Sequence, residues 1–338
     1  MSARPINRQD LATWGIATAA LLLILYLKLL PALIAGLLVY VLVNQLTPLL
    51  RRNRWLWGEW PRLVAVSIIA AIVIAVIGLI GMYAASLLRG SQDSIPALIT
   101  RMAEIIEQSR TQLPDWVSNY IPANADELQQ SIVGWLRAHA AVFQTAGTGL
   151  GRALAHIVIG MVIGGLLSLE TAVPAQSRGP LASALAKRSY RLSVAFRRVV
   201  FAQLWISALN TTFTALYLAV ALPLFGVDLP FTKTLIVVTF VAGLLPILGN
   251  LISNTVIFIV SFSQSPLVAL VSLAYLIVIH KLEYFLNARI IGSHIRARAW
   301  EMLLAMLLME AAFGIPGLIA APIYYAYMKS ELREKGLI

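Results

Sequence analysis

The chain has 338 residues, of which 59% are hydrophobic and 12% charged, and its mean hydropathy is +0.82. A soluble domain of this length does not need so much apolar surface, so the composition predicts an all-α, polytopic integral membrane protein. The net charge of +11 is compatible with nucleic-acid binding, but the basic residues cluster just beyond apolar segments, as in cytoplasmic loops of membrane proteins, and no nucleic-acid partner is expected.

Residues 1–88 contain three apolar segments, at 11–27, 31–50 and 63–88. Each is close to the ~20 residues that cross a bilayer as a helix. The second is followed at once by Arg51, Arg52 and Arg54. Basic residues beside a span favour the cytoplasm, so this end and, by parity, the N-terminus are expected inside, and the third span leads outside.

Residues 89–140 form a long polar stretch with six acidic residues and four arginines, which suits an external segment. Apolar residues recur at helical spacing between positions 95 and 106, and prolines at 114 and 122 interrupt the pattern. We expect short helices that lie on the membrane face or on a neighbouring subunit.

Residues 141–222 contain two further predicted spans, at 142–169 and 199–222, joined by a basic cytoplasmic linker. In the first of them Gly160 and Gly164 have a spacing that allows a neighbouring helix to approach closely. The linker is expected to form an amphipathic helix over residues 181–198 along the inner membrane surface. Its basic residues, Arg188 and Arg191 among them, are expected to face anionic headgroups.

Residues 223–338 contain two long apolar segments, 231–262 and 300–328, each interrupted by glycine and proline, with an unbroken apolar helix at 266–286 between them. Each interrupted segment is either one kinked span or a re-entrant hairpin of two half-helices. Kinked spans would place the arginine-containing loop 287–299 outside, against the charge rule, so we favour hairpins. The expected fold has about six full spans and two re-entrant hairpins, with eight spans as the alternative, and a cytoplasmic C-terminal tail.

The two interruptions are the predicted substrate path, because free backbone groups inside a membrane are tolerated only around a cavity. The half-helix ends are expected to present unpaired N–H and C=O groups to that cavity. The glycines would leave space for the solute or allow a positive φ, the prolines would set the turns, and the asparagines would bond a hydroxylated solute. The residues concerned are Gly243, Pro246, Gly249, Asn250 and Asn254 at the first interruption and Gly314, Pro316 and Gly317 at the second.

Other polar residues at membrane depth are candidates for proton or ion coupling or for a gate, because such residues are costly there. Glu310 precedes the second interruption, and as a buried acid it could carry a proton. Two further groups each share a helix face: His280, Glu283 and Asn287 on the helix at 266–286, and Gln203 with Asn210 on the fifth span. Each also has a structural interpretation. Glu310 could form an ion pair, the group with His280 could cap a helix at the membrane interface, and Gln203 with Asn210 could make a helix–helix contact.

Several features are typical of one transporter family. The N-terminal helix pair ends at Thr47-Pro48, an external segment follows the third span, and motifs occupy the last third. The motifs are Leu245-Pro246-Ile247-Leu248-Gly249-Asn250, Glu283 with Asn287, Ile290-Ile291-Gly292, Phe313-Gly314-Ile315-Pro316-Gly317-Leu318 and Ala321-Pro322. In these features the chain resembles the autoinducer-2 exporter family of permeases (PerM type). The resemblance implies a secondary transporter of the bacterial inner membrane that moves a small polar organic solute outward, and a homo-oligomer, with a pentamer as one arrangement.

Three functions remain open from the sequence: export of a small solute, cation/proton antiport and a non-transporting membrane scaffold. An enzyme is not expected, because no nucleophile–base pair is recognisable. The chain has no cysteine, and its four histidines are too far apart for a local zinc motif, so neither a metal nor a cofactor is expected. The expected partners are the solute, the lipid bilayer and further copies of the chain.

Overall fold

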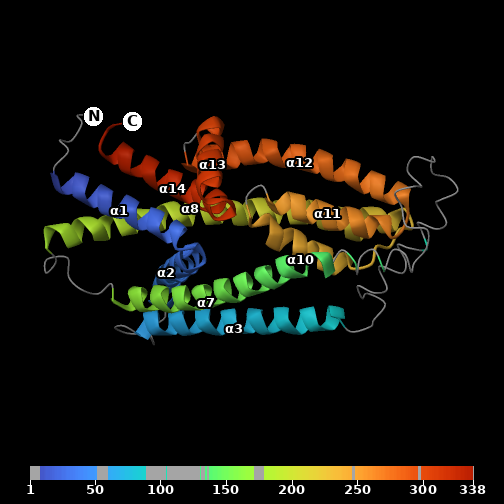
Figure 1. Cartoon of the computed structure of the whole chain (residues 1–338), viewed down its shortest axis with the longest axis horizontal. Coiled ribbons are helices and arrows are strands. Elements are labelled where there is room, and N and C mark those ends of the chain that lie inside the picture. Colours follow the sequence, from blue (N-terminus) through green and yellow to red (C-terminus); the bar gives the residue numbers. More distant parts are fainter. Residues whose placement is uncertain are drawn as a thin grey trace. The chain divides into compact units, whose positions relative to one another are not determined.

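The computed structural model describes residues 8–51, 60–88, 137–170, 179–245, 248–295 and 298–337, and single residues at 104, 130 and 134. The regular structure of these residues is helical, which confirms the predicted all-α fold (Figure 1). The predicted external segment, 89–140, lies almost wholly outside the described residues. The chain divides into two compact units, each of which is described by itself: unit 1 with Met1–Val76, Thr148–Ala202 and Ile290–Ile338, and unit 2 with Ile77–Gly147 and Gln203–Arg289.

Unit 1 begins with the predicted N-terminal spans. The turn between the first two is tight, and Lys28 adopts a left-handed backbone conformation there, with a φ of 59°. One apolar face of the second helix packs against the third, where Val43 and Ala65 are fully buried. The helices are α1 (Arg8–Tyr26), α2 (Leu30–Arg51) and α3 (Trp60–Leu88).

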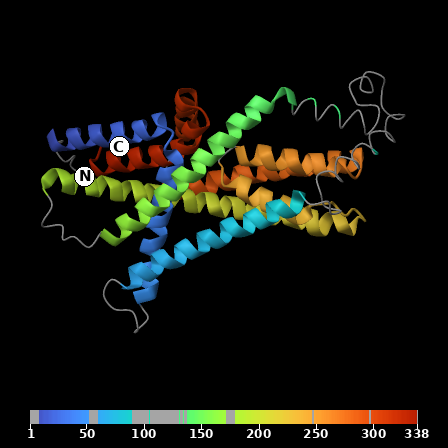
Figure 2. The same cartoon turned by 60° about the horizontal axis from the view of Figure 1, so that its bottom comes forward.

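The fourth predicted span is α7 (Ala140–Glu170), and its glycines make its contact with α2 (Figure 2). A Cβ atom at Gly160 would overlap the backbone of Ala32, and one at Gly164 would overlap the backbone of Gly36. The two helices therefore approach as closely as small residues allow, which confirms the packing role predicted for this glycine pair. Ala32 and Gly36 supply the matching small residues on α2 at the same four-residue spacing.

The predicted surface helix and the predicted fifth span form one helix, α8 (Pro180–Leu216), followed by a π-helical turn, η3 (Tyr217–Ala221), and α9 (Leu222–Leu224). The expectation of two elements is wrong because no glycine or proline interrupts residues 181–222. The expected headgroup contact is also wrong for Arg188, whose side chain is only 6% exposed and pairs with carboxylates of unit 1. Burial of a charge requires such compensation.

The first interrupted segment forms a helical hairpin in unit 2, made of α10 (Thr232–Gly243) and α11 (Leu248–Phe262) and followed by α12 (Pro266–Ile295) (Figure 1). The hydroxyls of Thr239 and Ser253 bond across the two arms at 2.6 Å. After α11, the Gln264 amide donates to the Asp228 carbonyl, which precedes α10, at 2.7 Å. The chain therefore leaves the hairpin at the end where it entered, as the re-entrant prediction requires.

The core of unit 2 lies between η3, α9 and the three helices that follow. Leu218, Leu235 and Ile257 are fully buried there. Tyr217, in the π-helical turn, bonds the Ser272 hydroxyl at 2.9 Å and stacks on the ring of Tyr275, with 4.0 Å between the centroids. These contacts attach η3, which continues α8, to α12.

The second interrupted segment is also a hairpin and belongs to unit 1. Its arms are α13 (Ala299–Phe313) and α14 (Ile315–Glu334), joined by Gly314 with φ 64° and ψ −147°. Glycine alone adopts this backbone region without strain. Glu301, near the start of α13, contacts Tyr325 and Lys329, in the second half of α14. The arms are therefore antiparallel, and the hairpin prediction is confirmed here too.

The contact between these arms predicts a pH dependence. Lys329 and then the Tyr325 hydroxyl lower the pKa of Glu301, which lies outside the candidate spans, from 4.5 to about 2. Because the folded-state pKa is depressed, the contact stabilises the hairpin above pH 4.5, and this stabilisation is lost as the pH falls towards 2. Between about pH 5 and about pH 3, wild-type protein should lose more thermal stability than Glu301→Gln, which lacks this titration. Equal losses in the two proteins would contradict the contact.

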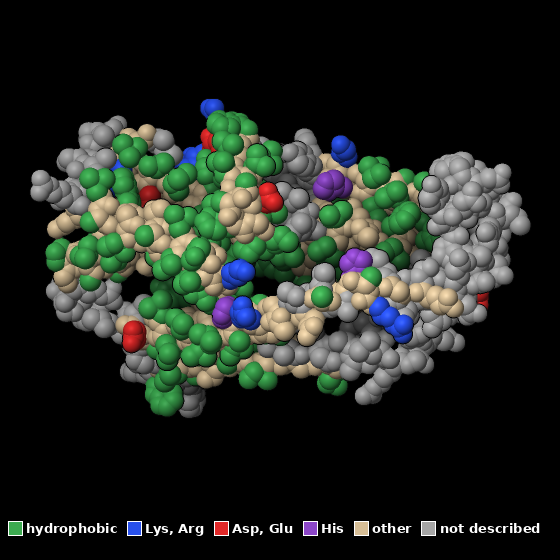
Figure 3. All heavy atoms as spheres, viewed as in Figure 1, with side chains coloured by type: hydrophobic (Ala, Val, Ile, Leu, Met, Phe, Trp, Pro, Cys, Tyr) green, Lys and Arg blue, Asp and Glu red, His purple; other side chains and the backbone are tan. Residues whose placement is uncertain are grey.

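Four helical segments are long and apolar enough to cross a membrane, counted over the described residues: Gln9–Tyr26, Leu30–Arg51, Gly151–Glu170 and Pro180–Leu224. The third and sixth predicted spans lie in α3 and α12, helices of 29 and 30 residues. Apolar side chains cover much of the face in Figure 3, and Ile74 and Leu307 are 71% and 64% exposed. Such a surface suits hydrocarbon better than water, as expected of a multi-pass membrane protein.

Candidate functional site

Within unit 2, α8 presents a row of polar side chains to the tip of the α10–α11 hairpin. Gln203, Ser207 and Asn210 are three or four residues apart and therefore share one face of the helix. Gln203 donates to the Gly243 carbonyl at 2.6 Å, and Ser207 donates to the Phe240 carbonyl at 2.6 Å. The polar face predicted for the fifth span thus meets the first interruption of the apolar sequence.

The last four carbonyls of α10 have no partner inside their own helix, yet all four are bonded. The two in the middle accept the N–H groups of Leu244 and Leu245 at 3.3 and 2.8 Å. The outer two accept Ser207 and Gln203. The expectation that this helix end presents unpaired carbonyls to a cavity is wrong, because α8 and the turn supply the missing donors.

Asn250, in the first turn of α11, connects α8 to α12. Its Oδ1 accepts the Asn210 amide at 3.0 Å, and its Nδ2 lies 3.0 Å from Nδ1 of His280. An amide nitrogen only donates, so this contact requires Nδ1 of His280 to be unprotonated. Asn254 follows one turn later on α11 and is half-buried. Five residues singled out from the sequence therefore lie together: Gln203, Asn210, Gly243, Asn250 and His280.

The glycines of the first interruption are closely packed. A Cβ atom at Gly249 would overlap the backbone of Ala242 and Gly243, and one at Gly243 would lie 2.6 Å from the Ser207 hydroxyl. The positions that side chains would occupy are therefore filled by the hairpin backbone and by α8. The expected reason for these glycines, open space for a solute, is wrong, and close approach of the two arms replaces it.

At the second interruption, Gly317 is also a packing glycine, since a Cβ atom there would overlap the Met309 carbonyl. Gly314 differs because nothing lies within 4 Å of its Cβ position, and its φ of 64° is the feature that requires glycine. Pro316 is in the first turn of α14, where an N–H has no helical partner. This interruption belongs to unit 1 and the first to unit 2, so a cavity shared by the two stays a prediction.

Glu310 is exposed on α13, and the expectation of a buried acid is therefore wrong. It lies in the last turn of its helix, beside the hairpin turn. Pro246 and the side chains of Glu283 and Asn287 lie outside the described residues, so the proposed pairing of His280 with Glu283 stays a prediction.

Three hydroxyl residues of this region were not singled out from the sequence: Ser207, Thr239 and Ser272. The four-residue spacing between Gln203 and Ser207 was the available signal for the first. Thr239 and Ser272 carried no comparable signal, because serine and threonine in helices commonly bond their own backbone. Here Thr239 bonds both the Leu235 carbonyl, at 2.8 Å, and Ser253.

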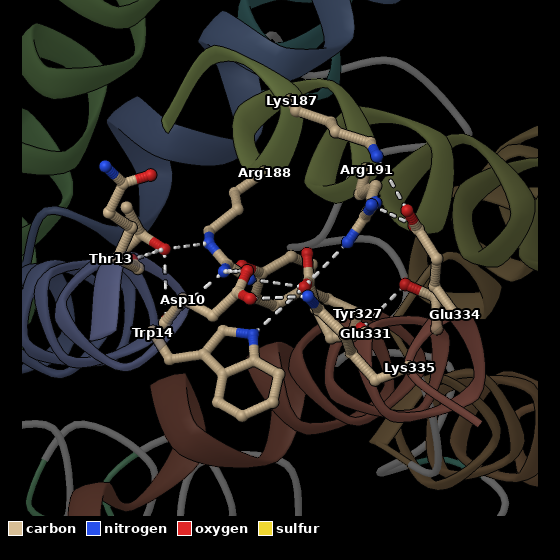
Figure 4. Close-up of polar contacts among 12 residues, drawn as sticks. Asp10, Thr13, Trp14, Lys187, Arg188, Arg191, Tyr327, Glu331, Glu334 and Lys335 are labelled. Carbon is tan, nitrogen blue, oxygen red and sulfur yellow. Dashed lines mark hydrogen bonds and ion pairs between the residues drawn. The ribbon is translucent and has the colours of Figure 1, made fainter. Parts of the chain in front are cut away.

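A second polar site connects α1, α8 and α14 in unit 1 (Figure 4). Arg188 donates to the Thr13 hydroxyl at 2.7 Å and pairs with Asp10 and Glu331. Arg191 also pairs with Glu331, at 2.7 Å. These five residues are called the terminal ion-pair cluster below, because acids near both chain ends neutralise arginines in the middle of the sequence.

Comparison with known proteins agrees with the sequence resemblance. A family model described as AI-2E family transporter matches residues 12–335. The match includes both hairpins and all helices of the two units except the first residues of α1. No curated protein matches the chain.

Proposed function

Because a family model matches nearly its whole length, the chain belongs to the AI-2E family of transporters, and we propose that it is a secondary transporter that exports a small polar organic solute. The family consists of transporters, so catalysis of a chemical reaction is not part of this proposal. An autoinducer-like signalling molecule is the solute class that the family name favours.

The observation that carries the proposal is the amide cluster at the tip of the α10–α11 hairpin. In this proposal the interruption lies at membrane depth, and Gln203, Asn210 and Asn250 bond there across α8, α10 and α11. Polar groups at this depth are costly unless they bond to each other or to a ligand. An amide both donates and accepts, as a solute hydroxyl does, so a solute could replace a helix–helix bond without leaving a buried group unpaired.

The test is transport by Asn250→Ala in proteoliposomes loaded with a panel of small polar solutes. Alanine removes the bonds to Asn210 and His280 together. We expect the transport rate to fall by about tenfold or more, since two hydrogen bonds are lost together and each contributes roughly 0.5–1.5 kcal/mol. The amount of inserted protein is measured in parallel and should be close to that of wild type.

The matched control is Thr212→Ala on α8. The Thr212 hydroxyl bonds only the Ala208 carbonyl of its own helix, at 2.8 Å. This variant should transport like wild type. Normal transport by Asn250→Ala, or the same loss in both variants, would count against the hairpin tip as the solute path.

Cation/proton antiport is the second candidate, and the contact of His280 with Asn250 favours it. A proton on Nδ1 would remove the acceptor for Asn250, so proton binding and this bond exclude each other. Antiport predicts that Glu310→Gln and His280→Gln abolish exchange of a cation for protons. The export proposal predicts that Glu310→Gln only weakens solute flux, and a scaffold would show no flux in any variant.

We further propose that the protein resides in the inner membrane of a bacterium with both termini in the cytoplasm. Basic residues flank the second span and the C-terminal end of α14, which supports this orientation. A homo-oligomer, with a pentamer as one arrangement, stays a prediction from the family resemblance.

A further inference from the structure

In unit 1, α8 and α14 enclose a basic groove that the proposed solute path does not use. Its volume is about 310 Å³, within the roughly 300–1,000 Å³ typical of small-molecule sites. Charged side chains line it from both helices: Arg191 and Arg198 from α8, and Lys329, Arg333 and Glu334 from α14. Four cations therefore face one carboxylate.

The carboxylate of this basic groove is already neutralised. Glu334 pairs with Lys187 at 2.7 Å and also with Arg191 (Figure 4). Arg198 is exposed, and among the described residues no carboxylate pairs with it. Arg191 also pairs with Glu331, and Lys329 pairs with Glu301. The positive charge left for an anion to compensate therefore includes that of Arg198.

The residues that line the groove favour one kind of anion, a phosphate group. A guanidinium binds phosphate through two parallel N–H···O bonds, so arginine is well suited to this group. The apolar residues Val194 and Ala326 and the hydroxyl-bearing Ser330 also line the groove. A lining that contains both apolar and cationic residues suits a phosphate attached to a hydrocarbon chain.

We propose that the basic groove binds a phosphate group, supplied by the headgroup of an anionic phospholipid. A soluble phosphate has the same recognition chemistry, so the experiment includes both sources. The proposal is independent of the transported solute, since its test measures binding and not flux.

The test compares full-length protein in nanodiscs of phosphatidylcholine alone with nanodiscs that also contain phosphatidylglycerol, and native mass spectrometry counts the retained lipids. Wild type should retain phosphatidylglycerol in preference to phosphatidylcholine. Each of Arg198→Gln and Arg333→Gln should lower the apparent affinity by about tenfold, since hydrogen bonds to charged groups are among the stronger ones. In phosphatidylcholine nanodiscs, inorganic phosphate is titrated while the thermal unfolding midpoint is followed.

The matched control is Arg197→Gln, which removes the same charge from an exposed neighbour that does not line the groove. It should keep the wild-type preference, and Arg198→Lys should recover part of the affinity lost in Arg198→Gln. Equal losses in Arg197→Gln and Arg198→Gln would overturn the proposal, as would the absence of any response to both phosphatidylglycerol and phosphate. A phosphate response that Arg198→Gln lacks, without lipid preference, would support the phosphate site and overturn the headgroup as its source.

Discussion

The substitution Gly164→Ala is expected to force α7 away from α2 and to lower the stability of the folded protein sharply. The added Cβ atom would overlap the carbonyl group and Cα of Gly36, which are backbone atoms that cannot move without shifting α2. Insertion of a methyl group into a close-packed contact costs about 1–3 kcal/mol. The cost should lie at the upper end, since no side chain can rotate away. Thermal unfolding of purified protein in detergent measures it.

The adjacent glycine provides the matched control. A Cβ atom at Gly165 would lie 3.5 Å from Cγ1 of Val66, an ordinary van der Waals contact. Gly165→Ala should therefore be tolerated, and the better helix propensity of alanine, worth about 1 kcal/mol over glycine, should favour it. Equal stability of the two variants would show that α7 and α2 do not pack through Gly164.

The substitution Arg188→Met is the second change with a large expected effect. Arg188 lies in the terminal ion-pair cluster, and the side chain of its partner Glu331 is only 5% exposed. Removal of one member of a buried ion pair costs about 3–5 kcal/mol, because the remaining charge is left without compensation. Arg191 still contacts Glu331 at 2.7 Å, so we expect about 3 kcal/mol. Denaturant unfolding in detergent micelles gives the value.

Three further proteins, Lys187→Ala, Glu331→Leu and the double variant Arg188→Met/Glu331→Leu, separate the charge effect from a general loss of packing. Lys187→Ala removes a neighbouring cation whose side chain is 60% exposed and pairs with Glu334, and it should cost at most about 1 kcal/mol. The double variant Arg188→Met/Glu331→Leu should recover much of the loss, since neither buried charge remains. A double variant as unstable as the sum of both single changes would contradict an ion pair.

The two interrupted segments show what a sequence pattern can predict and what it cannot. The basic loop between the segments favoured hairpins, and both segments form them. The pattern also marked Asn250 and the α8 face of Gln203 and Asn210, which meet at the hairpin tip. It assigned the wrong reason to Gly249 and Gly317, because apolar sequence alone does not show whether the space beside a glycine is open or filled.

The sequence by itself determined the helical class, the positions of the apolar segments and the two turns within them. These properties depend on residues close together in the chain: segment length against bilayer thickness, and glycine or proline against helix continuity. Only the tertiary structure decided which donors satisfy the end of α10, and which acids neutralise Arg188. Arg188 and Glu331 are 143 residues apart, and a helical pattern shows which face a side chain occupies but not which distant helix packs against that face.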